Sequence, residues 1–170
     1  ATEYLIQLGH TRIGIITGWM DLDSAMDRLE GYKAALWSHH IPFSEELVRE
    51  STFHQLDGYN SAMDLLNLTN PPTAIFASND SMAFGAMDAV REKSKRIPED
   101  ISIIGFDDIP QANIIHPALT TVRQPLRQMG SMATQMLLDL LKNPDTPSKR
   151  IELPTGLVVR DSCQPPKSTP

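Results

Sequence analysis

Several short apolar runs of this sequence are followed by a polar or aromatic side chain that could hold a hydroxyl-rich ligand. Asp107 follows the run ISIIGF, and Asn79 follows TAIFAS. Phe53 follows LVREST, and Arg28 lies a short loop beyond RIGIIT. A carboxylate accepts hydrogen bonds from hydroxyls, a guanidinium donates a planar fork, an amide does both, and an aromatic ring packs on the C–H face of a sugar. The set suits a polyol, and a purine base could use the same groups.

Each of these residues also has a purely structural interpretation. Asn79 could cap the helix that follows it, although Asp80 is the residue we expect to be the cap, and Asp108 is expected to cap the turn after Asp107. Arg28 could pair with an acidic neighbour at the surface for little net energy. Phe53 alone is typical of a core residue. The binding interpretation is favoured because all four candidates follow the ends of predicted strands.

Catalytic and metal-binding chemistry fits the sequence poorly. It contains no G-x-S-x-G elbow, no H-E-x-x-H pair and no glycine-rich phosphate or dinucleotide loop. The one cysteine, Cys163, can form neither a disulfide framework nor a paired-cysteine metal site. Histidines stand at positions 10, 39, 40, 54 and 116, without metal-ligand spacing beyond the adjacent pair. We therefore expect no catalytic residue, no metal and no cofactor.

The candidate residues meet only if the apolar runs before them are neighbouring parallel strands. Strands are expected at 12–17, 47–52, 73–78 and 101–106. Apolar residues at helical spacing lie between them, at 23–40, 57–68 and 79–93. This alternation predicts an α/β fold, an open and mainly parallel sheet with helices on both faces. Ligands bind such sheets beyond the carboxyl ends of the strands, where the candidates stand.

The two ends of the chain follow another pattern. Residues 1–10 resemble the last turns of a helix closed by Gly9. Further along, 119–122 is expected to be extended, 125–142 to be an amphipathic helix with a methionine-rich face, and 151–154 and 156–159 to be strands. The formal net charge is −6, and the only basic cluster, at 91–96, is typical of a solvated helix end. We expect this chain to contact neither nucleic acid nor a membrane. We expect a cytoplasmic location.

Five segments of the chain resemble, in order and spacing, the effector-binding core of the LacI/GalR family of bacterial transcription regulators. They are GHTRIGIITG, SAMDRLEGY, PPTAIFASNDSMAFGAM, RIPEDISIIGFDDI and PALTTVRQPLRQMG. The resemblance extends from Leu8 to about Arg160. It implies a two-lobed, type I periplasmic-binding-protein-like fold with a ligand cleft between the lobes. It also implies a homodimer and an N-terminal helix-turn-helix headpiece that reads operator DNA.

The resemblance assigns roles to particular positions. Arg28, Phe53, Asn79 and Asp107 match the family's ligand-binding positions. The implied dimer contact comprises Met82, Ala86, Met87, Ile114 and Ile115, and packing in the protomer core is the alternative. Ser94 stands where the family usually has a helix-ending glycine, so we expect the loop before Ile97 to take another route.

The resemblance also implies a division of the chain. Residues 1–123 match the C-terminal lobe, starting within its first helix, and 124–142 match a returning helix that belongs to the N-terminal lobe. Residues 143–163 are expected to form closing strands and 164–170 a disordered tail. The headpiece and most of the N-terminal lobe have no counterpart here. The returning helix thus lacks the sheet it should cover, and we expect it to pack elsewhere, such as on another copy.

The implied function is sensing of a sugar-like effector and dimerisation within a LacI-type DNA-binding transcription regulator. Operator DNA would be contacted only through the missing headpiece. A secreted or periplasmic sugar-binding protein of the same fold is the alternative. A regulator whose signal is a partner protein, with a vestigial pocket, is a third possibility.

Overall fold

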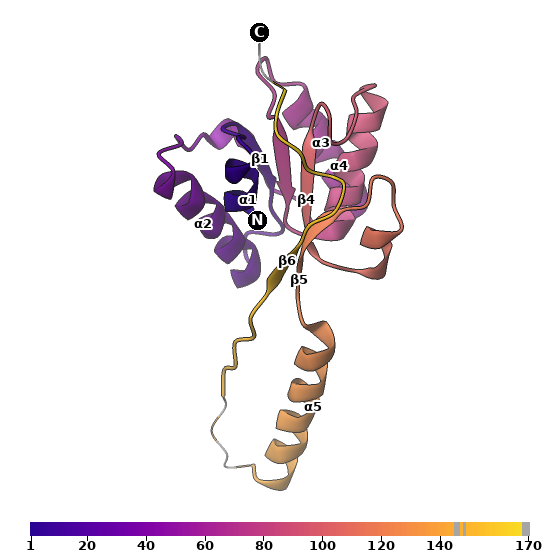
Figure 1. Ribbon diagram of the computed structural model, residues 1–170. Helices are drawn as coiled ribbons and strands as arrows, with labels where there is room; N and C mark the ends of the chain where they lie inside the picture. The colour runs from indigo at the N-terminus through magenta and orange to yellow at the C-terminus, as the bar shows by residue number, and fades with distance from the viewer. Residues whose placement is uncertain (145–146, 148, 168–170) are drawn as a thin grey trace.

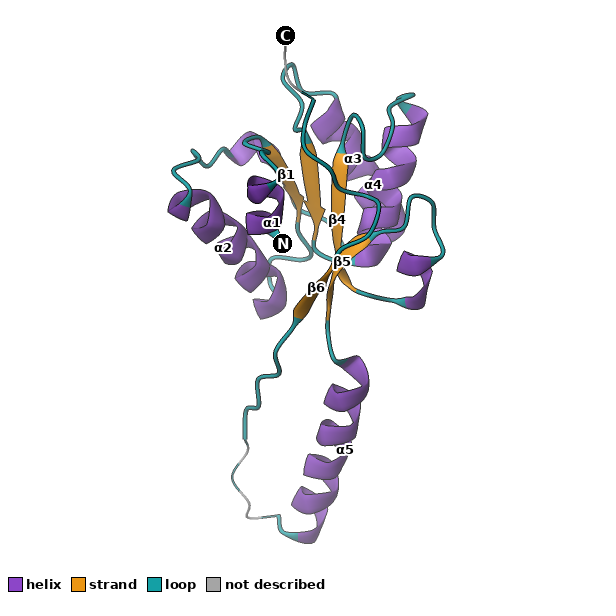
Figure 2. Cartoon of the chain, viewed as in Figure 1, coloured by secondary structure: helices purple, strands orange, loops and turns teal. Residues whose placement is uncertain are grey.

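A six-stranded sheet forms the centre of the computed structural model, which describes residues 1–144, 147 and 149–167. The strands lie in the order β2-β1-β3-β4-β5-β6. The first five are parallel to their neighbours, and β6 runs antiparallel to β5. Their bounds are β1 Ile13–Ile16, β2 Val48–Arg49, β3 Ala74–Ala77, β4 Ser102–Asp107, β5 Thr120–Arg123 and β6 Gly156–Val158. The predicted open, mainly parallel sheet is therefore confirmed (Figure 2).

Helices cover both faces of this sheet, as the alternation of strands and helices predicted (Figure 1). They are α1 Thr2–Gln7, α2 Asp23–Ser38, α3 Gln55–Leu66 and α4 Asp80–Glu92, with short 3-10 turns at Glu45–Leu47 and Pro110–Asn113. One face packs Ile15 and Ile104 against α1 and α2. The other packs Ile16 and Ile103 against α3 and α4. Successive strand residues point to opposite faces, so an unbroken apolar run supplies both cores.

The two helices on the second face approach each other unusually closely. A Cβ on Gly85 of α4 would lie 2.0 Å from the carbonyl oxygen of Gln55, and a Cβ on Gly58 of α3 would lie 2.5 Å from Met82 Cα. Real Cβ atoms do not approach backbone atoms so closely, so glycine at both positions permits the contact.

Residues with positive φ follow α1, α2 and α4, and the one after α2 is His40, with φ +57°. Gly9 follows α1 with φ +100°, and the backbone N–H groups of Gly9 and His10 donate to the carbonyls of Ile6 and Leu5. Ser94 follows α4 with φ +55°, in the conformation that a glycine adopts at a helix end. The expected change of route before Ile97 is therefore wrong, and Ser94 bears a left-handed strain of roughly 1–2 kcal/mol.

A fifth helix, α5 (Leu126–Lys142), projects away from the sheet and its covering helices (Figure 1). No side chain of α5 is buried, and its exposed residues include Met129, Leu137 and Leu141. The apolar face of α5 is thus not covered by the lobe, and the expectation that the helix packs elsewhere, such as on another copy, stays a prediction. No described helix is long and apolar enough to span a membrane.

Of the two strands predicted where the chain returns from α5 to the lobe, only the second is present, as β6. The predicted strand at 151–154 is wrong, because β5 ends at Arg123 and leads through Pro125 into α5, so residues before Gly156 have no partner strand. Beyond β6, Ser162 exchanges backbone and side-chain hydrogen bonds with Ile103 of β4.

The end of the chain continues along the sheet beyond Ser162. The carbonyl oxygen of Gln164 is bonded by His10 and Ser102, and Lys167 pairs with Asp100. A disordered tail is therefore wrong for 164–167, and 168–170 lie outside the described residues.

Candidate functional site

At the carboxyl end of β4 the chain turns sharply and separates two adjacent carboxylates. Asp107 and Asp108 both have positive φ, +119° and +59°. Asp107 Oδ1 accepts a 2.6 Å hydrogen bond from Gln124 Nε2. Asp108 instead forms ion pairs with Arg123 and Arg160. The prediction that Asp108 caps the following turn is wrong, because its carboxylate is occupied by two guanidinium groups.

Different surroundings shift the pKa values of these two carboxyl groups in opposite directions. Burial raises the pKa of Asp107, and the hydrogen bond from Gln124 and the charge of Arg28 offset this only in part. Burial alone would also raise the pKa of Asp108, yet the hydrogen bonds from Arg160 and Arg123 together hold it below its ordinary value. Asp107 is therefore the carboxylate that keeps unused capacity to accept hydrogen bonds from a ligand.

Arg28 brings a positive charge to the same edge of the sheet. Its guanidinium carbon lies 4.0 Å from the centroid of the Phe106 ring, a cation–π geometry, and Nη1 donates a 2.9 Å hydrogen bond to the carbonyl oxygen of Ser78. Burial lowers the pKa of Arg28, and the nearby charge of Asp107 opposes this effect. The alternative of a surface pair with an acidic neighbour is wrong, since no ion pair among the described residues involves Arg28 and its guanidinium contacts Ser78 and Phe106 instead.

Asn79 follows β3, and Phe53 lies in the loop that follows β2. Asn79 Oδ1 accepts a 2.8 Å hydrogen bond from the backbone N–H of Met82, which makes Asn79 the N-cap of α4, and Nδ2 donates to the carbonyl oxygen of Phe53. The Phe53 ring lies against Gly18, where a Cβ would come within 1.8 Å of it. The amide and the carboxylate directly follow strand ends or end a strand, whereas the Arg28 guanidinium comes from α2 and the Phe53 ring from the loop after β2, where it packs against the core.

The residue we expected to be the helix cap, Asp80, is instead fully buried beneath this edge. Its carboxylate accepts hydrogen bonds from Thr121 Oγ1 at 2.5 Å and from the backbone N–H of Ile109 at 2.9 Å. Burial raises the pKa of Asp80 to about 6, against the effect of these hydrogen bonds. Gly105 leaves it room, because a Cβ there would lie 2.3 Å from Asp80 Oδ1. A glycine inside the strand ISIIGF was the one sequence signal of this close approach.

Two hollows adjoin this edge. A hollow of about 690 Å³ extends from Asp107 and Gln124 to the first turn of α5. A second, of about 750 Å³, lies beside Arg28 and Phe106. Among the described residues, no group of three His, Cys, Asp or Glu side chains is placed to hold a metal ion. The edge offers hydrogen bonds, one positive and one negative charge, and an aromatic face.

Comparison with known proteins identifies the family. Residues 2–163 match the family of periplasmic binding protein-like domains. In sequence, the chain is 44% identical over 164 residues to the probable HTH-type transcriptional repressor ExuR of Bacillus subtilis (strain 168), and 38% identical to the HTH-type transcriptional repressor PurR of Vibrio atlanticus (strain LGP32). This chain is a periplasmic binding protein-like domain of the LacI family. Each alignment covers 96% of the chain and 49% of the relative, so the chain spans about half the length of these relatives.

Solved structures of LacI-family regulators have the same fold as this domain. A complex of the transcriptional regulator CelR with cellobiose superposes with a TM-score of 0.91 at 34% identity, over 95% of this chain and 50% of that one. A putative transcriptional regulator LacI from Bacillus cereus subsp. cytotoxis superposes with a TM-score of 0.93 at 34% identity, over 96% and 58%.

The dimer contact inferred from the family resemblance needs correction at three positions. Met82, Ala86 and Met87 are fully buried between α4 and the sheet. Apolar spacing along a helix does not distinguish a face turned to its own sheet from one turned to a partner. In this LacI-family domain these side chains have no surface left for a second protomer. Ile114, by contrast, is 71% exposed, and Ile115 is partly exposed.

Proposed function

We propose that this domain senses a small hydroxyl-bearing effector, most simply a sugar, within a LacI-type transcription regulator. The observation that carries the proposal is the grouping of Arg28, Phe106 and Asp107 at one edge of the sheet. A half-buried guanidinium and a half-buried carboxylate with spare hydrogen-bonding capacity are matched to the donors and acceptors of a polyol. The LacI-family relatives favour a regulator over a secreted sugar-binding protein.

The candidate residues would contribute unequally to effector binding. Asp107 accepts hydroxyl hydrogen bonds in exchange for, or beside, its bond to Gln124. Arg28 donates hydrogen bonds from its guanidinium, which is held in place by stacking on Phe106 and by its bond to the carbonyl oxygen of Ser78. Asn79 already uses its side-chain oxygen and nitrogen as cap and bridge, so its contact with an effector would be through remaining lone-pair capacity.

A homodimer, a cytoplasmic location and contact with operator DNA through a separate headpiece belong to the same proposal. The surface suited to the dimer contact is a hollow of about 290 Å³ lined by Phe84, Asp88, Ile114 and Ile115 with neighbouring glutamines. Ligand bound across two lobes would favour one lobe arrangement through its differential contacts, by a coupling on the order of 1–3 kcal/mol. The partner-sensing alternative predicts no such ligand.

The proposal is tested by a thermal-shift panel on the longer parent protein. Mono- and disaccharides, including ribose and cellobiose, sugar phosphates and purines are compared with Arg28→Ala and Asp107→Ala beside the wild type. A compound that binds only the native state stabilises it by ~2.7 kcal/mol at a hundredfold excess over its Kd. We expect one compound class to raise the Tm of the wild type and of neither variant.

The matched control is Asp100→Ala, which removes a carboxylate from the opposite edge of the sheet, where it pairs with Arg96 and Lys167. This variant should keep the full ligand-induced shift. A shift that survives in both Arg28→Ala and Asp107→Ala, or no shift with any compound, would count against effector binding at this edge.

A further inference from the structure

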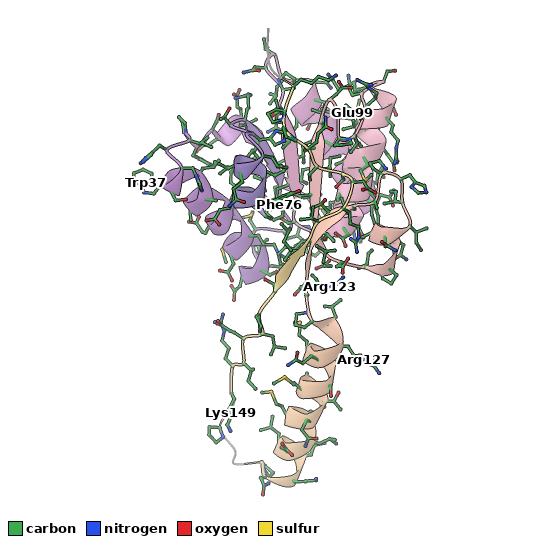
Figure 3. All side chains as sticks on the ribbon, in the orientation of Figure 1. Trp37, Phe76, Glu99, Arg123, Arg127 and Lys149 are labelled. Carbon is green, nitrogen blue, oxygen red and sulfur yellow. The ribbon has the colours of Figure 1, made fainter. Side chains whose placement is uncertain are left out.

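Two chain segments connect the lobe to α5, and nothing else in the described structure holds this helix in place. The outgoing segment is β5 with Gln124 and Pro125, and the returning segment ends in β6. They are paired antiparallel, with Arg123 opposite Gly156. Because no side chain of α5 is buried, its direction depends on how these two strands leave the sheet. Figure 3 shows Arg123 at this junction, with Arg127 on the first turn of α5 beyond it.

One carboxylate, that of Asp108, is bonded to Arg123 of the outgoing strand and to Arg160, which follows the returning strand by two residues. Its Oδ2 accepts from Arg123 Nε, on the outgoing strand, at 2.5 Å. Its Oδ1 accepts from Arg160 Nη2, just after the returning strand, at 2.6 Å. The Asp108 side chain is 7% exposed and that of Arg160 is 13% exposed. A pair so shielded from water is screened much less by salt than a surface pair.

Further hydrogen bonds fix the members of this cluster to the sheet. Arg160 Nη1 donates to the carbonyl oxygen of Leu119 at 2.7 Å, and the backbone N–H of Arg160 donates to Thr120 Oγ1. The residue after Asp108 is held as well, because the backbone N–H of Ile109 donates to the buried carboxylate of Asp80. The Asp108 carboxylate is thus held against the sheet, and it bonds the last residue of β5 and the segment that directly follows β6.

We propose that Asp108 is the positioning residue that fixes the direction in which the two connecting strands, and with them α5, leave the lobe. It follows directly after Asp107, the proposed effector ligand, so the connection is built on the same turn as the pocket. The proposal goes beyond effector sensing and does not depend on it, because its test needs no ligand.

The test measures distances between spin labels on the 170-residue chain. In a Cys163→Ser background, cysteines replace Ser38, at the end of α2, and Thr134, in the middle of α5; both sites are exposed. Pulsed electron–electron double resonance then gives the distribution of distances between the label on the lobe and the label on α5. We expect a broader or displaced distribution in Asp108→Asn than in the wild type, because the neutral amide loses both ion pairs.

Asp100→Asn is the matched control, since Asp100 also joins two cations, Arg96 and Lys167, but at the far edge of the sheet. It should leave the distribution unchanged, and circular dichroism should show all variants folded. A variant that only unfolds α5 would lose helical dichroism, which separates that effect from a change in the direction of an intact helix.

Arg123→Gln keeps the test decisive if Asp108→Asn does not fold. The Arg123 side chain is 60% exposed, so its replacement removes only the outgoing link and leaves the pair between Asp108 and Arg160. We expect a smaller broadening than in Asp108→Asn. Distributions identical to the wild type in Arg123→Gln and in any folded Asp108→Asn would overturn the proposal and assign the direction of α5 to the backbone pairing of β5 with β6.

Discussion

Replacing Asp80 by Asn should change how the stability of this domain depends on pH. Asp80 is fully buried, and burial raises its pKa from an ordinary value of 3.8 to about 6. Between these two values the folded chain holds a proton that the unfolded chain releases. The free energy of unfolding therefore falls as pH rises through this window. Above the folded pKa the penalty of the buried charge is fully present, and below the ordinary value it is absent.

The size of this penalty follows from the two pKa values. Each pKa unit corresponds to ~1.4 kcal/mol, so the charged form costs ~3 kcal/mol at neutral pH relative to the protonated form. About 2 kcal/mol of this develops between roughly pH 4.5 and pH 7.5. Asn carries no proton to lose, so the stability of Asp80→Asn should lack this component while keeping partners for Thr121 and Ile109.

The assay is urea denaturation of the wild type and Asp80→Asn across that pH range. The advantage of the wild type over the variant should shrink by ~2 kcal/mol from the acidic to the neutral end. Asp100→Asn is the control, because its pairing with Lys167 and Arg96 lowers the pKa of Asp100 to about 2, and a group ionised throughout the range adds no pH dependence. A difference between wild type and Asp80→Asn that stays constant with pH would refute the reasoning.

Two further perturbations test the packing and the buried histidine. In Gly85→Ala the new Cβ would lie 2.0 Å from the Gln55 carbonyl oxygen, so the free energy of unfolding measured in urea should fall by ~3 kcal/mol or more. In Gly31→Ala the new Cβ has nothing within 4 Å, so this variant should stabilise α2 by ~0.5–1 kcal/mol. Equal effects of the two substitutions would contradict the close approach of α3 and α4. Burial lowers the pKa of His10 below 6.5, so the unfolded chain binds the proton first and the free energy of unfolding falls as pH falls through that value. His10→Gln should therefore lose less stability than the wild type on the same acidification. Parallel curves of unfolding free energy against pH for the two proteins would contradict this.

Local patterns predicted the parallel strands well, because short apolar runs rich in β-branched residues and bounded by polar residues are typical of buried strands. The edge rule for parallel sheets then brought Arg28, Asn79 and Asp107 together correctly. The expectation that Asp80 caps α4, which came from local capping preferences, was wrong, because Asn79 is the cap. Whether Asn79 or Asp80 caps α4 depends on Thr121 and Ile109, which claim the Asp80 carboxylate from far along the chain. No local pattern contains that information.

The same limit explains the errors at Asp108 and on α4. The partners of Asp108 stand 15 and 52 residues away in the sequence, so a turn cap was the only role visible locally. Met82 and Met87 lie on an apolar helical face, and such a face is equally suited to the protomer's own sheet and to a second subunit. Only the position of α4 over β3 and β4 decides for the core.

The antiparallel pairing of β5 with β6 makes the stretch between them a long loop of a hairpin. Arg123 and Gly156 are register partners, so residues 124–155 begin and end at neighbouring points. Closure entropy grows only with the logarithm of loop length, which makes the length of this stretch a weak determinant of the lobe's stability. A chain in which a short turn joins Arg123 directly to Gly156 should therefore fold as a self-sufficient lobe, provided the residues after Gly156 are kept. Those last residues complete the hydrogen bonding of β4, so during synthesis the lobe cannot close before the residues up to Ser162 have been made.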